Sequence, residues 1–142
     1  MIDLRICIDV PDVDRAIEFY RAAIGLELGR RLGQDMAEML GAAVPIDLLG
    51  KPAGSKATPA APATRAYTRH WTPVHLDVVV DDVDAAVARA QAAGATLEAG
   101  PNDHTWGRMA NLADPFGNGL CLIELRGRGY DELVAPGNPA PA

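Results

Sequence analysis

In two short stretches of the sequence, polar or charged residues alternate with apolar ones. Arg5 and Asp9 lie in "LRICIDV", and His75 and Asp77 lie in "VHLDVVV". An arginine can hold a carboxylate or phosphate through two parallel hydrogen bonds, and an imidazole can transfer protons near neutral pH. Together with Glu124 of "LCLIEL", Arg5 and His75 are therefore candidate catalytic residues. The structural alternative is that these charges only pair with one another, as buried ionic groups often do.

Aromatic side chains flank the second stretch. Trp71 precedes it, and His104 and Trp106 lie in "NDHTWGRM" (residues 102–109). Ligand pockets are commonly lined by aromatic groups, so Trp106 could form a wall against a planar ligand, although a tryptophan can equally be core packing. The candidate ligand-binding residues are Asp9, Trp71, Asp77, His104 and Trp106.

The chain contains an internal repeat that positions these residues. "VPDVD" at residues 10–14 returns as "VDDVD" at residues 80–84, with Asp12 and Asp82 at matching places. Self-similarity at a fixed spacing indicates a duplicated structural unit. In both copies an aspartate follows a strand-like pattern and precedes apolar residues at helical spacing, which predicts a capped helix. A glycine then follows each helix, at Gly25 and Gly94, where a left-handed residue often ends one.

Each copy continues with shorter strand-like segments, so each reads strand–helix–strand–strand–strand. We expect these segments at 26–32, 35–40 and 44–49 in the first copy, and at 96–98, 107–112 and 119–125 in the second. "DPFGNG" (residues 114–119) is turn chemistry, which accounts for it without catalysis. The predicted divisions are a first module at 1–50, a flexible connection at 51–72, a second module at 73–126 and a tail at 127–142.

Composition limits the classes of partner. The chain has 142 residues and a net charge of -6, which argues against nucleic acid, because phosphate binding needs a basic face. No apolar run approaches the ~20 residues of a membrane helix, and the start of the sequence has no pattern of a cleaved leader. Cys7 and Cys121 belong to no CxxC pair. We therefore expect a cytoplasmic protein with reduced thiols.

The duplicated βαβββ unit, the helix after "V-x-D-V-D" and the closing "DPFGN…LIEL" together resemble the vicinal oxygen chelate superfamily. That superfamily includes glyoxalase I, extradiol dioxygenases, fosfomycin-resistance transferases and bleomycin-binding resistance proteins. The resemblance covers about residues 2–49 and 73–125. It implies an α+β fold in which two tandem βαβββ modules form curved mixed sheets around a cavity. The second copy also resembles short actinobacterial-type proteins.

In metalloenzymes of the superfamily, each module supplies ligands from its first strand and from the end of its last strand. In the second module the resemblance assigns these places to His75 and Glu124, which would suit Fe(II), Mn(II), Ni(II) or Zn(II). In the first module the corresponding residues are Arg5 and Gly50, and neither binds a metal through its side chain. Three protein ligands are usual at a catalytic site of this kind. A third could come from His70 or His104, and a site without metal is nearly as well supported.

Two functions follow from the resemblance. One is an enzyme acting on a small oxygenated metabolite, as a lyase, isomerase or dioxygenase, with or without metal. Glyoxalase I activity itself is disfavoured, because the acidic residue missing at Gly50 is both ligand and base in that enzyme. The other is a protein that sequesters a small molecule, as bleomycin-resistance proteins do. His75 and Glu124 favour the enzyme, Arg5 and Gly50 favour sequestration, and exposed sheet edges predict a homodimer in either case.

Overall fold

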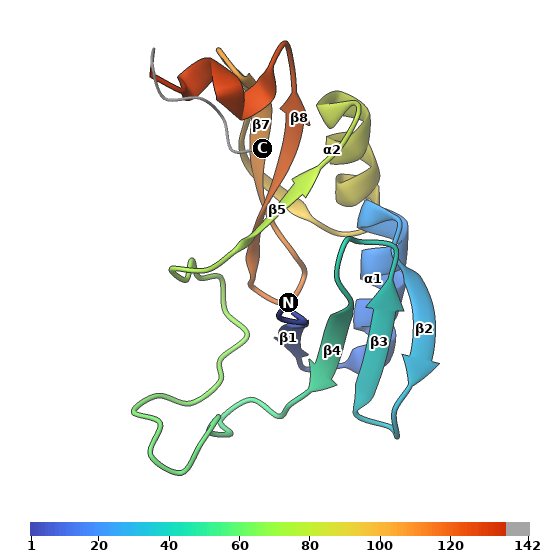
Figure 1. Cartoon of the computed structure of the whole chain (residues 1–142). Helices are drawn as coiled ribbons and strands as arrows, with labels where there is room; N and C mark the ends of the chain where they lie inside the picture. The colour runs from blue at the N-terminus through green and yellow to red at the C-terminus, as the bar shows by residue number, and fades with distance from the viewer. Residues whose placement is uncertain (136–142) are drawn as a thin grey trace.

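The computed structural model describes residues 1–135, and its two halves are built alike (Figure 1). The first half contains β1 (Ile6–Val10), α1 (Val13–Ile24), β2 (Glu27–Arg31), β3 (Met36–Leu40) and β4 (Ile46–Gly50). The second half contains β5 (Leu76–Val79), α2 (Val83–Ala92), β6 (Thr96–His104), β7 (Gly107–Ala113) and β8 (Gly119–Leu125). A 3-10 helix, η1 (Gly129–Leu133), follows. Within residues 1–135, no helix is long and apolar enough to cross a membrane.

Each half forms one four-stranded mixed sheet. The strand orders are β1-β4-β3-β2 and β5-β8-β7-β6. In both sheets the first strand of the module pairs in parallel with the last, and the remaining pairs are antiparallel. Ile6 lies opposite Ile46 in the first sheet, as Leu76 lies opposite Leu120 in the second. The predicted α+β fold of two tandem βαβββ modules is confirmed, and the two sheets stay separate rather than closing into a barrel.

The helices begin where the repeat predicts. The Asp12 carboxylate accepts a hydrogen bond of 3.0 Å from the amide of Arg15, and the Asp82 carboxylate accepts one of 2.9 Å from Ala85. These bonds satisfy amide groups that have no partner inside the helix. Gly25 ends α1 in the left-handed region, at φ 78°. Ala93 caps α2, and the expected Gly94 follows it with a positive φ of 110°.

Both helices pack their apolar faces into one core that spans the two modules. The buried residues include the predicted stripes of α1 and α2, and the two helices contact each other. The core faces of the sheets contribute Leu48 of β4 and Leu122 of β8, both fully buried. The residues of the predicted stripes are Val13, Ala16, Ile17, Tyr20, Val83, Ala86, Val87 and Ala90.

Two segments differ from the sequence prediction. β6 is much longer than the expected 96–98 segment, because Asn102 and His104 still pair with β7, opposite Met109 and Gly107. Gly100-Pro101 is typical of a strand end, but here a shift of register absorbs the proline and pairing resumes beyond it. Part of the predicted tail forms η1. Residues 136–142 of that tail lie outside the described residues.

A buried hydrogen bond joins the two modules. The Tyr20 hydroxyl of α1 donates to a carboxylate oxygen of Asp114, between β7 and β8, at 2.7 Å. The same carboxylate accepts hydrogen bonds from the amides of Phe116 and Asn118 and from the Asn118 side chain. Burial and this carboxylate raise the pKa of Tyr20 well above its usual value. Asp114 therefore has the structural role expected for its turn, and it also fastens the first module to the second.

Removing the Tyr20 hydroxyl tests this junction. We expect Tyr20→Phe to lower the free energy of unfolding by about 1–2 kcal/mol, because a buried carboxylate loses one donor while Asn118 remains. Urea unfolding followed by circular dichroism measures the effect. Tyr130→Phe, on half-exposed Tyr130, is the matched control. Equal stability of the Tyr20→Phe variant and the wild type would contradict the assignment.

Candidate functional site

Strand register decides which candidate residues share a face of the second sheet. Asp77 lies opposite Cys121, and Leu76 lies opposite Leu120. Because side chains alternate along a strand, His75, Asp77 and Cys121 point to the inner face. Leu76 and Leu120 point to the helices and pack with the core.

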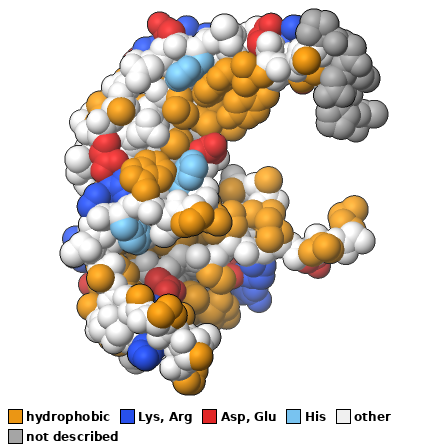
Figure 2. Space-filling model, turned by 90° about the vertical axis from the view of Figure 1, so that its left-hand side faces the viewer, with side chains coloured by type: hydrophobic (Ala, Val, Ile, Leu, Met, Phe, Trp, Pro, Cys, Tyr) orange, Lys and Arg blue, Asp and Glu red, His pale blue; other side chains and the backbone are white. Residues whose placement is uncertain are grey.

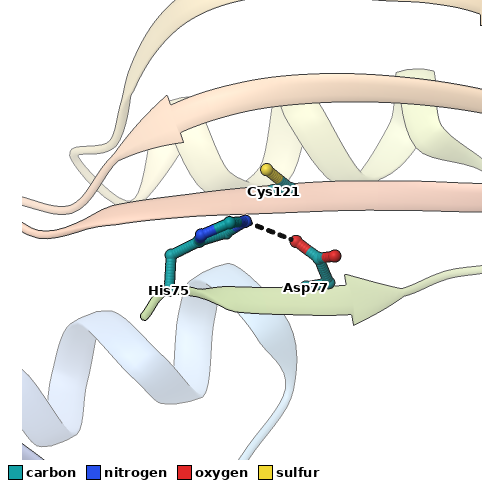
Figure 3. A group of neighbouring side chains, drawn as sticks. All are labelled: His75, Asp77 and Cys121. Atoms are coloured by element: carbon teal, nitrogen blue, oxygen red, sulfur yellow. Dashed lines mark ion pairs between the residues drawn. The ribbon is translucent and has the colours of Figure 1, made fainter. Parts of the chain in front are cut away.

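Three side chains of different chemistry meet on the inner face (Figure 3). Nε2 of His75 lies 3.1 Å from Oδ1 of Asp77. One ligand atom each from His75, Asp77 and Cys121 lies within 4.8 Å of the others. The Asn111 amide of β7 donates to the Cys121 sulfur at 3.2 Å. We call these three side chains the His–Asp–Cys cluster.

Electrostatics keep the buried thiol protonated when no cation is bound. Cys121 is 2% exposed, and burial, followed by the Asp77 carboxylate, raises the pKa of its thiol to about 11. Burial, followed by the Asp77 carboxylate, also raises the pKa of Tyr130 on η1.

The structure does not bring Glu124 to His75. Glu124 lies two residues beyond Leu122, on the helix face of the sheet. One of its oxygens accepts a 3.0 Å hydrogen bond from the amide of Val83, the first residue of α2, and the other accepts one of 2.6 Å from Arg126. These bonds lower its pKa. Glu124 therefore holds the start of α2, and the expected convergence of His75 and Glu124 is not found in this structure.

Arg5 lies in a network of charges on the inner face of the first sheet. Its guanidinium donates to both oxygens of Asp47, at 2.8 and 2.6 Å, and to Glu38 at 2.6 Å. Arg30 donates twice to Glu38, at 2.7 Å. Glu38 and Asp47 are 5% and 2% exposed. The hydrogen bonds from Arg30 and Arg5 hold the pKa of Glu38 at about 2, so Arg5 is already paired within its module.

Sequence reasoning missed Glu38 and Asp47. Their signal was available, because each is a single acid inside an apolar strand, in "MAEML" and "PIDLL". A charge at such a position needs a partner. Strand pairing explains why the partner is Arg5. Asp47 lies between Glu38 and Cys7 in the sheet, and Arg5 precedes Cys7 by two residues, so its side chain points to the same face.

A cavity of about 760 Å³ lies between the first strands of the two modules. Figure 2 shows that this side of the molecule is hollowed, with hydrophobic side chains along the upper wall of the hollow and histidines nearby. Asp9, His75 and His70 line the cavity. The other lining residues are Ile6, Cys7, Ile8, Tyr20, Thr64, Arg65, Ala66, Tyr67, Thr68, Thr72, Val74, Leu76, Asn118, Gly119 and Leu120.

The predicted connection forms one wall of this cavity. Arg65 donates to the Asp9 carboxylate at 2.5 Å, and the Tyr67 hydroxyl donates to the carbonyl of Lys51 at 2.6 Å. Trp71 packs against Gly119, where an added Cβ would lie 2.8 Å from the indole ring. Residues 64–72 are therefore fastened to both modules. The composition of the connection indicates its bounds but not this role.

The candidate aromatic residues lie in two places. The Trp71 ring meets His75 edge-on, with centroids 5.0 Å apart, and therefore borders the His–Asp–Cys cluster. His104 and Trp106 stack on each other at 4.8 Å near the β6–β7 turn, and Trp106 also contacts Tyr130 at 5.0 Å. His104 and Trp106 are not among the residues that line the cavity. A direct wall of the cavity is thus formed by Tyr67 rather than by Trp106.

Comparisons with known proteins agree with the fold. A family profile described as a glyoxalase-like domain matches residues 5–123. An uncharacterised protein of Mycobacterium tuberculosis is 36% identical over 138 residues, covering 89% of this chain and 76% of that protein. A glyoxalase/bleomycin resistance protein/dioxygenase from Nocardioides has a TM-score of 0.63 at 20% identity, covering 100% of this chain and 89% of that one. The antibiotic-binding protein TnmS3 from Streptomyces has a TM-score of 0.57 at 26% identity, covering 88% and 98%.

The charge network of the first sheet makes a prediction about pH. Because the folded state lowers the pKa of Glu38 from 4.5 to about 2, its contribution to stability is complete above about pH 4.5. That contribution is lost as the pH falls toward 2, since the unfolded chain then binds the proton more tightly. The melting temperature should therefore fall less steeply between pH 6 and pH 2 for Glu38→Gln than for the wild type. Glu18→Gln, at an exposed site on α1, should keep the wild-type slope; identical slopes for all three proteins would disprove the network's role.

Proposed function

Because the chain belongs to the glyoxalase-like family of the vicinal oxygen chelate superfamily, we propose that it binds a small molecule in the cavity between its two modules. The cavity itself is the observation that carries this proposal. Its volume of about 760 Å³ is within the range of roughly 300–1,000 Å³ typical of sites for drug-sized ligands.

The lining favours a ligand that is mainly apolar and neutral. Apolar groups come from the core faces of the first strands, such as Ile8 and Leu76. The charged groups at the wall already have partners, since Asp9 pairs with Arg65 and His75 contacts Asp77. The hydroxyl of Thr68 and the side-chain carbonyl oxygen of Asn118, whose amide nitrogen already donates to Asp114, can orient a ligand through hydrogen bonds.

Sequestration is the form of binding that the first module supports best. In the sequence His75 and Glu124 favour an enzyme, but Glu124 holds the start of α2, and Arg5 is held by Asp47 and Glu38. Gly50 leaves no room for a larger side chain, because an added Cβ would lie 2.9 Å from Val13. TnmS3, described as an antibiotic-binding protein, has this fold. We therefore expect a largely apolar small molecule as the ligand.

An enzyme acting on a small oxygenated metabolite is the second candidate. The observation that favours it is the convergence of His75, Asp77 and Cys121 beside the cavity. Three protein ligands are the usual number at a catalytic divalent metal, and a bound Fe, Mn, Ni or Zn ion would polarise substrate oxygens. In this candidate His75 holds the metal, and its assignment as a lyase, isomerase or dioxygenase stays open.

The homodimer expected from the sequence and its cytoplasmic location stay predictions. Apolar side chains exposed around β2, an edge strand of the first sheet, and its neighbour β3 support self-association, since such edges need cover. These are Leu28, Leu32 and Leu40, each exposed by 41–43%. Sedimentation at micromolar concentration should give twice the 15.0 kDa chain mass, and a monomer would contradict the dimer.

Filling the cavity tests the binding proposal. Ala66 lines the cavity, and Ala63 lies in the same connection outside the lining. The probe is N-phenyl-1-naphthylamine, a neutral apolar compound whose fluorescence reports binding. We expect saturable binding of one probe per chain, weakened about tenfold or more in Ala66→Trp, a loss of roughly 1.4 kcal/mol, and unchanged in Ala63→Trp. Equal affinities of both variants, or no saturable binding by the wild type, would disprove binding in this cavity.

A further inference from the structure

We propose that His75, Asp77 and Cys121 form a binding site for one thiophilic divalent cation, with Zn²⁺ as the expected ion. The site uses the Cys121 thiolate and the Asp77 carboxylate, which neither the repeat nor the resemblance assigned as metal ligands. It deepens the second candidate function by naming the ion, and it is independent of the ligand-binding proposal, because the cation can bind while the cavity is empty.

The geometry brings together three donors from two neighbouring strands. Asp77 and Cys121 are opposite partners of β5 and β8, and His75 precedes Asp77 by two residues on the same face. Their ligand atoms lie within 4.8 Å of one another. Zinc accepts nitrogen, oxygen and sulfur ligands at roughly 2.0–2.3 Å in a tetrahedron. Of the three side chains, His75 also lines the cavity.

The donor set selects the class of metal. Thiolate and imidazole ligands favour zinc over magnesium or calcium, which prefer oxygen. The Asn111 amide donates to the sulfur and so stabilises a thiolate in the way outer ligands of metal sites do. His75 and Asp77 have side chains 38% and 47% exposed, which gives an ion a path to buried Cys121. On binding, the thiol proton passes to solvent and a metal–sulfur bond replaces the S–H bond.

The first module shows the same arrangement with a cation already built in. By register, Cys7 and Asp47 occupy the places of Asp77 and Cys121. The place of His75, 70 residues earlier, is Arg5, whose guanidinium binds the Asp47 carboxylate. The second module has a carboxylate and a thiol at these positions. In place of the arginine it has an imidazole, which can be uncharged near neutral pH. An external cation would neutralise that set as Arg5 neutralises the first.

Cobalt is the spectroscopic probe for this site. Metal-free protein titrated with Co²⁺ should bind one ion per chain and develop the near-ultraviolet band of sulfur-to-cobalt charge transfer, which Zn²⁺ then removes. Cys121→Ser should lose the band, and Asp77→Asn should weaken binding about tenfold or more. Cys7→Ser is the matched control for the second thiol, and Glu124→Gln is the control for the pair expected from the sequence. Both variants should bind Co²⁺ and show the band as the wild type does.

Several outcomes would overturn the site. One is no stoichiometric binding of Co²⁺ or Zn²⁺ at tens of micromolar. Others are a band that survives Cys121→Ser, one that disappears in Cys7→Ser, or metal lost in Glu124→Gln. If Cys121→Ser fails to fold by circular dichroism, Asp77→Asn decides, because Asp77 is half exposed. Probe binding to metal-free protein reports on the cavity separately, so failure of the metal site and failure of the ligand-binding proposal are distinguishable.

Discussion

The parallel pairing of the first and last strands in each module determines which side chains of this protein can meet. Opposite residues of paired strands point to the same side of a sheet, and side chains alternate along each strand. The register that places Asp77 beside Cys121 therefore places His75 with both of them and sends Glu124 to α2. In the first module the same register places Asp47 between Cys7 and Glu38, within reach of Arg5. Both clusters follow from one feature of topology.

The cavity depends on a second constraint, which is the attachment of one module to the other. Within residues 1–135 the two sheets share no hydrogen-bonded strands, so their relation depends on the packing of α1 against α2 and on the bond from Tyr20 to Asp114. Tyr20 also lines the cavity. A bond that fixes the modules thus lies at the wall of the space between them, and the connection closes another wall through Arg65 and Trp71. Ligand binding and the stability of the module junction are expected to be coupled.

The sequence predicted the fold well because the repeat, the helix caps and the apolar stripes all act locally. It predicted the candidate site less well because the site depends on register. Alternation within "LCLIEL" correctly grouped Glu124 with Leu120 and Leu122, but it could not show that this face is the one shared with Leu76 rather than with His75. The predicted end of β6 was wrong for a related reason. The Gly100-Pro101 sequence is typical of a turn, but β6 continues to pair with β7 beyond it, where Asn102 lies opposite Met109. Local patterns contain no direct information about such long-range partners.

The two modules illustrate how a duplicated scaffold can diverge at one row of positions. Exchange of an arginine for a histidine changes a charge that is always present into a group that accepts a proton or a metal. In the first module the arginine is held by two buried carboxylates, and the row is a closed structural unit. In the second module Asn111 occupies the place of Glu38, and the row keeps an uncharged amide, a thiol and one carboxylate around the imidazole. In the first module Arg5 balances the charges of the carboxylates. In the second module the three possible metal ligands have no arginine among them. We therefore expect a cation to bind at this row of the second module and not at the corresponding row of the first.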